Sequence, residues 1–310
     1  MIDLHTHSSA SDGSFSPSGL VAEAEKRGIS VLALTDHDSI EGLEEAAKAA
    51  MERGIGFIPG IEVEIAWNRE NPANAAAKNA EKKSPTGEFH LLGLGISRSN
   101  PEIIRAIEEL ARRREARNLE IVDKMNKAGI AISYPELKAL VTGQEAGQAP
   151  ARRHSFGRLH FADFLVKKKL VKNHEQAFAR YLGRGQPFFF PKEGLEFEQA
   201  VELIKNSGGI SVLAHPMSLY LAWGQLPSFV KNLKERGLDG IEAWHPNAKL
   251  SACRRLEELA KNLGLYISAG SDFHGEARPD RKLGITAGGK KIDESLLYSP
   301  DGSKSLVSYC

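Results

Sequence analysis

The sequence predicts an α/β protein built around a parallel sheet or barrel, with a helical region inserted into it. Short apolar runs typical of buried strands alternate with longer stretches whose apolar residues recur every three or four positions, as in amphipathic helices. Five of the apolar runs also lead into histidines or acids. The carboxyl ends of the strands of a parallel α/β barrel share one face, so we expect these side chains to converge.

The first strand lies at the start of the chain and leads through His5 and His7 to Asp12. Residues two apart on a strand point to the same face, so His5 and His7 direct both imidazoles to one place. Imidazole suits zinc, iron and manganese, and a carboxylate suits harder ions. Two histidines at this spacing also occur by chance, so the pair alone favours a metal site only modestly.

Four further runs repeat this arrangement. They are 31–34, leading to Asp36, His37 and Asp38; 55–63, with Glu62; 210–214, ending at His215 and Pro216; and 265–269, leading to Asp272 and His274. Any one of them is equally consistent with a core strand whose polar end reaches solvent. Five occurrences in one chain favour a metal site at the carboxyl ends of the strands.

Two more histidines belong to runs that resemble strands. The run 89–96 carries His90 near its start, which is a further ligand if this strand lies beside the one with Glu62. Residues 242–246 close another strand and place His245 at the same end. For His245 a role in the pocket and a purely structural role are equally consistent with the sequence.

Helices are expected between these strands. The candidates are 17–27, 40–53, 195–206, 226–236 and 250–263, and glycines typical of helix C-termini stand near their ends at Gly28, Gly54, Gly208, Gly237 and Gly264. The polar segment 68–88 reads as a loop, and 101–129 as one long helix.

The basic run from Arg152 to His160 has side chains suited to binding phosphate. An ordinary basic surface loop is equally consistent with its composition.

Composition excludes several classes of protein. The chain has 310 residues, 41% hydrophobic content and a formal charge of +1, so it has no overall bias toward nucleic acid or membranes. Its two cysteines, Cys253 and Cys310, suggest no disulfide framework. With no apolar segment of transmembrane length and no secretory leader, we expect a soluble cytoplasmic protein without a membrane or an obligate protein partner. P-loop, GxGxxG and GxSxG motifs are absent.

Taken in chain order, the motifs around His5, His37, Glu62, His215 and Asp272 resemble the PHP (polymerase and histidinol phosphatase) family. The resemblance spans almost the whole chain and is strongest to the bacterial group of nucleoside 3′,5′-bisphosphate phosphatases and RNA 5′-exonucleases. It implies a distorted (β/α)7 barrel with a mainly helical insertion. The barrel would comprise 1–100 and 191–290, the insertion 101–190 would cap the active site, and 291–310 would be a C-terminal tail.

The resemblance also implies a trinuclear centre of divalent ions, with manganese preferred and iron or zinc as alternatives. The implied ligands are His5, His7, Glu62 and Asp272 for the first ion, Asp12, His37 and His274 for the second, and Glu62, His90 and His215 for the third, with Glu62 bridging. Asp272 and His274 would therefore also be catalytic.

By the same resemblance, Arg158 and His160 would bind the substrate phosphate and act in catalysis, although Leu159 stands where the group usually has proline. His245 would bind substrate, and His160, His245 or a water would protonate the leaving oxygen. A metal-bridging hydroxide would attack phosphorus.

We therefore expect a phosphatase that converts a nucleoside 3′,5′-bisphosphate to the 5′-monophosphate. The alternatives are a 5′-3′ exoribonuclease acting on short RNA, a histidinol-phosphate phosphatase, an amide hydrolase, and a non-catalytic module stabilised by metal.

Overall fold

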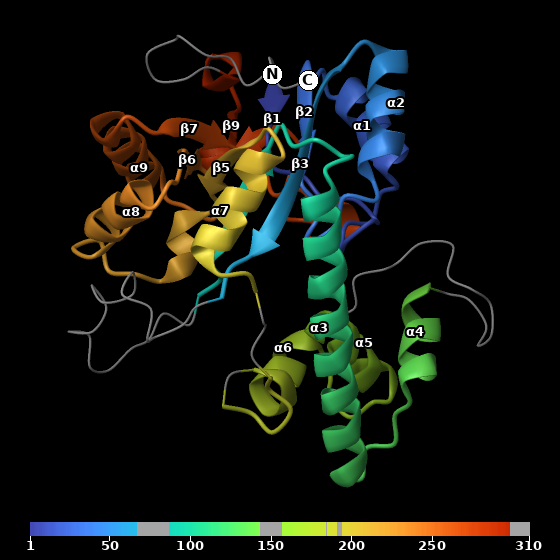
Figure 1. The fold of residues 1–310 in the computed structure, drawn as a ribbon. Helices are drawn as coiled ribbons and strands as arrows, with labels where there is room; N and C mark the ends of the chain where they lie inside the picture. The colour runs from blue at the N-terminus through green and yellow to red at the C-terminus, as the bar shows by residue number, and fades with distance from the viewer. Residues whose placement is uncertain (67–86, 143–156, 184, 191–193, 298–310) are drawn as a thin grey trace. The chain divides into compact units, whose positions relative to one another are not determined.

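The computed structural model describes residues 1–66, 87–142, 157–183, 185–190 and 194–297 (Figure 1). They form two compact units, which we call the barrel unit (Met1–Ile107 and Gly194–Cys310) and the helical unit (Glu108–Glu193). Most of the polar segment 68–88, the basic residues 152–156 and residues 298–310 of the expected tail lie outside the described residues.

The barrel unit contains a seven-stranded sheet whose strands lie side by side in chain order. The strands are β1 (Ile2–Asp3), β2 (Val31–Leu34), β3 (Gly56–Glu64), β4 (His90–Leu94), β5 (Ile210–Leu213), β6 (Gly240–Trp244) and β7 (Tyr266–Ala269). The two edges are joined by hydrogen bonds from Asp272 N to His5 O and from His7 N to Phe273 O, both 2.9 Å long. The sheet is therefore a nearly closed, distorted barrel, as predicted.

Strand β4 is antiparallel to both of its neighbours, whereas all other neighbouring strands of this sheet are parallel. The alternation of strands and helices predicts parallel neighbours, and for β4 this expectation is wrong. Within the described residues no helix lies between β3 and β4, and only parallel neighbours need a long crossover connection. As a result His90, at the start of β4, lies opposite Glu64 at the end of β3.

An apolar cluster fills the barrel and sets the direction of the polar side chains above it. Its buried members are Ile2, Leu4, Val31, Ala33, Ile58, Leu92, Leu94, Ile210, Val212, Ala214, Ala269 and Ile292. Burying a side chain the size of leucine or isoleucine contributes about 1.5–3 kcal/mol. Because alternate residues of a strand share a face, Glu62 lies on the face of Ile58, and His90 on the face of Leu92.

The helices of the barrel unit lie outside the sheet (Figure 1). They are α1 (Pro17–Lys26), α2 (Leu43–Arg53), α7 (Phe197–Asn206), α8 (Leu226–Glu235) and α9 (Leu250–Leu263), all close to the predicted bounds. In α7 the buried Phe197, Ala200, Val201 and Ile204 recur with the helical period. The unit also holds the short strands β8 (Ile285–Thr286) and β9 (Lys290–Lys291), and 3₁₀ turns at Pro216–Leu219, Gly275–Ala277, Ala287–Gly289 and Glu294–Leu297.

The helical unit has its own apolar core. The long helix α3 (Pro101–Lys127) begins in the barrel unit and continues here, followed by α4 (Tyr134–Thr142), α5 (Arg158–Lys167), α6 (His174–Ala177) and a π turn at Phe178–Leu182. Phe161, Phe164 and Leu165 of α5 pack with Ile121 and Met125 of α3. Among the residues that the structure describes, no helix is long and apolar enough to cross a membrane.

Candidate metal centre

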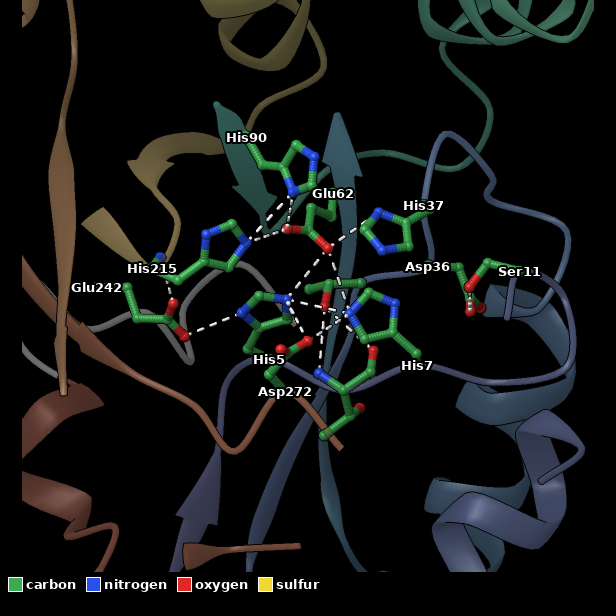
Figure 2. Close-up of polar contacts among 12 residues, drawn as sticks. His5, His7, Ser11, Asp36, His37, Glu62, His90, His215, Glu242 and Asp272 are labelled. Carbon is green, nitrogen blue, oxygen red and sulfur yellow. Dashed lines mark hydrogen bonds and ion pairs between the residues drawn. The ribbon is translucent and has the colours of Figure 1, made fainter. Parts of the chain in front are cut away.

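The nine predicted metal ligands come from six segments of the barrel unit and form one contiguous cluster, most of which Figure 2 shows. His5 and His7 follow β1, and Glu62 lies in β3; all three side chains are fully buried. An ionised carboxylate and imidazoles at such a depth are costly unless they are paired or coordinate an ion. The cluster therefore has the composition and the burial of a cation site.

The first predicted set consists of His5, His7, Glu62 and Asp272. The Nε2 atoms of the two histidines lie 3.1 Å apart and are 3.2 and 3.3 Å from Oε2 of Glu62. Oδ1 of Asp272 lies 3.6 Å from Nε2 of His5 and 3.3 Å from Nε2 of His7. Four atoms held tetrahedrally at about 2.1 Å from one ion are about 3.4 Å from one another. These four atoms thus have the spacing that one ion requires.

The two carboxylate oxygens of Glu62 face different groups of histidines. Oε2 faces His5 and His7, whereas Oε1 lies 2.7 Å from Nδ1 of His90 and 2.8 Å from Nε2 of His215. The latter two nitrogens are 3.3 Å apart. The geometry fits a carboxylate that bridges two ions, the role predicted for Glu62.

The second predicted set is more open. Oδ1 of Asp12 lies 3.2 Å from Nε2 of His274, and Oδ2 lies 3.9 Å from Nε2 of His37. Ligand atoms of His7, Asp12, His37 and His274 all lie within 4.8 Å of one another. Nδ1 of His37 is also 3.1 Å from Oε2 of Glu62, so His37 lies between the second set and the carboxylate. The side chains of Asp12 and His37 are 24% and 25% exposed, so solvent reaches the cluster from their side.

Three of the histidines have their outer ring nitrogen fixed by an acceptor. Nδ1 of His5 lies 3.0 Å from Glu242, Nε2 of His90 lies 2.8 Å from Glu64, and Nδ1 of His274 lies 2.8 Å from the carbonyl of Asp272. Such contacts choose the tautomer and direct the other nitrogen inward. Histidines that hold a metal are usually arranged in this way.

Asp36 fixes the loop that carries Asp12. This buried carboxylate accepts hydrogen bonds from N (2.8 Å) and Oγ (2.7 Å) of Ser8 and from Oγ (2.6 Å) of Ser11. Asp36 stands in one of the predicted runs, but its contacts make it a structural support for the loop.

The electrostatics of the cluster favour ionised carboxylates. Burial alone would raise the pKa of Glu62, but the nearby His37, His90 and His5 hold it well below its usual value. Burial would lower the pKa of His7, but Asp272 and Glu62 raise it to about 9. In His37 burial prevails and lowers the pKa to about 3. Without metal, protons on histidines such as His7 compensate the negative charge that an ion would otherwise neutralise.

Two predicted ligand residues and one glycine show how tightly the backbone is held here. His215 and Asp272 have positive φ angles of 29° and 53°, in a region that costs non-glycine residues about 1–3 kcal/mol. At Gly270 an added Cβ would lie 2.2 Å from Cβ of His5 and 2.8 Å from Oε1 of Glu242. Only glycine allows β7 to approach the first strand this closely.

The three residues predicted to contact substrate are found in different units. His245 follows β6, and its Nε2 lies 3.4 Å from Oδ2 of Asp272, at the edge of the cluster. Arg158 and His160 lie in the first turn of α5 in the helical unit. Nδ1 of His160 accepts a hydrogen bond from the N–H of Gly157 (3.0 Å), and the Arg158 guanidinium lies over the ring of Phe189. Their contact with substrate stays a prediction.

Sequence reasoning missed four residues around the cluster. Glu64 and Glu242 support predicted ligand histidines, and Arg278 and Arg281 approach Asp272. A signal for the two acids was present, since Glu64 shares a strand face with Glu62, and Glu242 lies near the carboxyl end of its strand. Nothing in the local sequence distinguishes the two arginines from surface residues.

Comparison with known proteins adds independent information. A family model described as PHP domain matches residues 3–102. A 5′-3′ exoribonuclease of Haemophilus influenzae is 35% identical over 88% of this chain and 89% of its own length. A 3′,5′-nucleoside bisphosphate phosphatase of Chromobacterium violaceum is 31% identical over 92% of this chain and 91% of its own length.

Solved structures share the fold across nearly the whole chain. An amidohydrolase from Chromobacterium violaceum with bound sulfate superposes with a TM-score of 0.74 at 29% identity, covering 96% of this chain and 98% of that one. A structure from Bifidobacterium adolescentis, described as that of a metal-dependent phosphoesterase, has a TM-score of 0.73 at 26% identity, covering 95% and 93%.

Proposed function

Because this chain belongs to the PHP family and is a metal-dependent phosphoric ester hydrolase, we propose that it converts a nucleoside 3′,5′-bisphosphate to the 5′-monophosphate. The observation that carries the proposal is the arrangement of Glu62, whose two oxygens face separate groups of histidines. Phosphoryl transfer by several ions uses such a bridging carboxylate to hold them close together. We prefer the bisphosphate as the substrate because the relative from Chromobacterium violaceum is named as a 3′,5′-nucleoside bisphosphate phosphatase. Its match covers a share of this chain similar to that of the exoribonuclease.

The proposed cofactor is a set of three divalent ions, with manganese preferred over iron or zinc. The residues that would hold them are the three predicted sets, joined by Glu62. Bound there, the ions would supply a hydroxide nucleophile near neutral pH and neutralise charge on the phosphoryl oxygens. Mixed imidazole and carboxylate donors suit all three metals.

The protein residues orient the ester and supply the proton that its leaving oxygen needs. Hydrolysis consumes one water, and the leaving 3′-oxygen of the nucleotide takes up a proton. Nδ1 of His245 accepts the N–H of Asn247 (3.2 Å), so a neutral ring carries its proton on Nε2, the atom that faces Asp272. His245 can give this proton to the leaving oxygen only as the doubly protonated, cationic ring, so the candidate donors are His245 in that form, His160 and a water, and Arg158 is proposed to bind the scissile phosphate.

A second candidate function is 5′-3′ exonucleolytic cleavage of short RNA. The exoribonuclease of Haemophilus influenzae supports it, with the higher identity of the two relatives. Both reactions hydrolyse a phosphate ester, so the same cluster serves either one. The two reactions differ in how many phosphates of the substrate the protein must contact. Because an exonuclease contacts several, its affinity for RNA should fall steeply as the salt concentration is raised.

The experiment that separates them is phosphate or nucleotide release by manganese-loaded protein from four substrates. These are adenosine 3′,5′-bisphosphate, AMP, histidinol phosphate and a 5′-phosphorylated RNA oligonucleotide. We expect the bisphosphate to be preferred, with kcat/KM above about 10⁴ M⁻¹s⁻¹. Faster release of mononucleotides from RNA would favour the exonuclease, and no turnover of any of the four with metal bound would contradict both.

A further inference from the structure

Asp272 has two carboxylate oxygens with different surroundings. Oδ1 faces the ligand histidines His5 and His7 at 3.6 and 3.3 Å. Oδ2 faces three other donors, with Nε2 of His245 at 3.4 Å, Nη1 of Arg278 at 3.6 Å and Nη2 of Arg281 at 3.8 Å. Asp272 therefore separates the metal ligands on one side from a group of nitrogen donors on the other, which we call the Asp272 flank (His245, Arg278 and Arg281).

Several donors of the flank are buried without a hydrogen-bond partner. Among the described residues, Nε and Nη1 of Arg281 are buried and donate to no hydrogen-bond partner, and the buried Nε2 of His245 has only its 3.4 Å contact with Asp272. The side chain of Arg281 is only 3% exposed, and its one hydrogen bond among these residues runs from Nη2 to Oδ1 of Asn247. Asp280 lies 3.5 Å from its Nε, but that acid is 74% exposed. Buried guanidinium donors are costly when they are not satisfied, so this group is suited to take up an anion.

Arg278 connects the flank to solvent. Its side chain is 39% exposed, and it follows the ligand residue His274 by four positions. Asp272 is the carboxylate that the two guanidinium groups share, while Asp280 also lies beside Arg281 and Glu88 adds negative charge near Arg278. The planar N–H groups of the two arginines match a phosphate, which accepts paired hydrogen bonds from arginine.

We propose that the Asp272 flank binds a second, non-scissile phosphate beside the metal centre. The inference rests on the proposed function and deepens it, because it assigns the 5′-phosphate of a nucleoside 3′,5′-bisphosphate to named residues. The scissile phosphate is bound on the Oδ1 side of Asp272, where the metal ligands converge. The 5′-phosphate is bound on the Oδ2 side, and its contacts with both arginines select bisphosphates over nucleotides that lack it.

The first test compares kcat/KM for adenosine 3′,5′-bisphosphate with that for 3′-AMP, which lacks the 5′-phosphate. We expect the ratio of the two values to fall at least tenfold in Arg278→Gln and in Arg281→Gln. Damage to the metal centre slows both substrates and cancels in the ratio, so a purely structural role for the arginines leaves it unchanged. Arg27→Gln is the matched control, because Arg27 is 40% exposed and pairs with a carboxylate at the opposite end of the strands.

The second test measures binding of 5′-AMP and of adenosine to the full-length protein by calorimetry, with and without manganese. We expect the Arg278 and Arg281 variants to bind 5′-AMP at least tenfold more weakly than the wild type does. Their affinity for adenosine should change little. The melting temperature of each variant shows whether the buried core is intact. Arg281→Lys, which keeps the charge, is a second control that separates loss of the subsite from loss of the core.

If the ratio of the two kcat/KM values and the affinity for 5′-AMP are both unchanged in the variants, the proposed subsite is wrong. The proposed phosphatase activity would not be affected by that result. If the wild-type protein hydrolyses none of the esters but binds 5′-AMP through the two arginines, the proposed function fails and the anion subsite stands.

Discussion

Nδ1 of His5 lies 3.0 Å from Oε1 of Glu242, and neither side chain is exposed to solvent. The other oxygen of Glu242 accepts a hydrogen bond of 2.6 Å from the backbone N–H of His215. One buried acid thus holds the ring of one predicted ligand and the backbone of another, which stand 210 positions apart in the chain. Glu242 thus links the first and third predicted ligand sets through its contacts with His5 and His215.

Replacement of Glu242 should weaken metal binding more than it weakens the fold. In Glu242→Gln we expect about 10–100-fold lower metal affinity, because the amide keeps only one acceptor oxygen for the two N–H groups that Glu242 binds, those of His5 and His215. Competition titration with a chelating indicator measures the affinity, and calorimetric melting measures stability. Glu198→Gln, at an exposed acid, is the control. Wild-type metal affinity in Glu242→Gln would refute the coupling role.

Loss of a ligand from the first set should abolish turnover. We expect His5→Ala and Asp272→Ala to have no measurable phosphatase activity and reduced metal content, with the circular dichroism of the wild type. His174→Ala serves as the control, because that histidine is half exposed and pairs with Asp163 in the helical unit. Activity at the wild-type rate in either ligand variant would exclude the proposed metal centre.

Metal affinity should rise with pH up to about 9. His7 has a pKa raised to about 9 in the metal-free protein, so below that pH a proton must leave before this ring can bind an ion. Each displaced proton makes affinity increase about tenfold per pH unit. Calorimetry at pH 7 in buffers of different ionisation enthalpy counts the protons released. An absence of proton release on binding manganese would show that His7 is already neutral.

Gly270→Ala should destabilise the barrel at the metal centre. The new Cβ would lie 2.2 Å from that of His5, and a shift of the backbone to relieve such overpacking costs about 1–3 kcal/mol. We expect a lower melting temperature together with lower metal content. Gly224→Ala, where a Cβ meets nothing within 4 Å, should have neither effect. If the two variants melt alike, the close approach of β7 to the first strand is not required.

Arg158 tests whether the helical unit contributes to catalysis. If its guanidinium binds the scissile phosphate, Arg158→Ala should raise KM for phosphate esters or lower kcat by about tenfold or more. Arg180→Ala, another arginine of the same unit, is the control. Kinetic constants that match the wild type would restrict substrate binding to the barrel unit.

Much of the fold follows from local sequence patterns. The helical period places α9 at its predicted bounds, and a glycine at left-handed φ ends both α2 and α9. The direction of β4 could not be derived in this way, because an apolar run has the same pattern in either direction. The pairing of β4 with β3 also explains why His90 stands at the start of its strand while Glu62 stands near the end of its own.

The sequence by itself determined which residue types are available to the centre, because histidines and acids at the ends of apolar runs are visible without a structure. The tertiary structure alone decided which atoms face one another: the two oxygens of Glu62, the support of His5 by Glu242, and the position of Arg278 and Arg281 beside Asp272. These relationships depend on closure of the barrel, which joins the first strand to the segment after β7. Periodicity reports the face on which a side chain lies, whereas contacts across a closed sheet depend on register and strand direction, which local sequence does not encode.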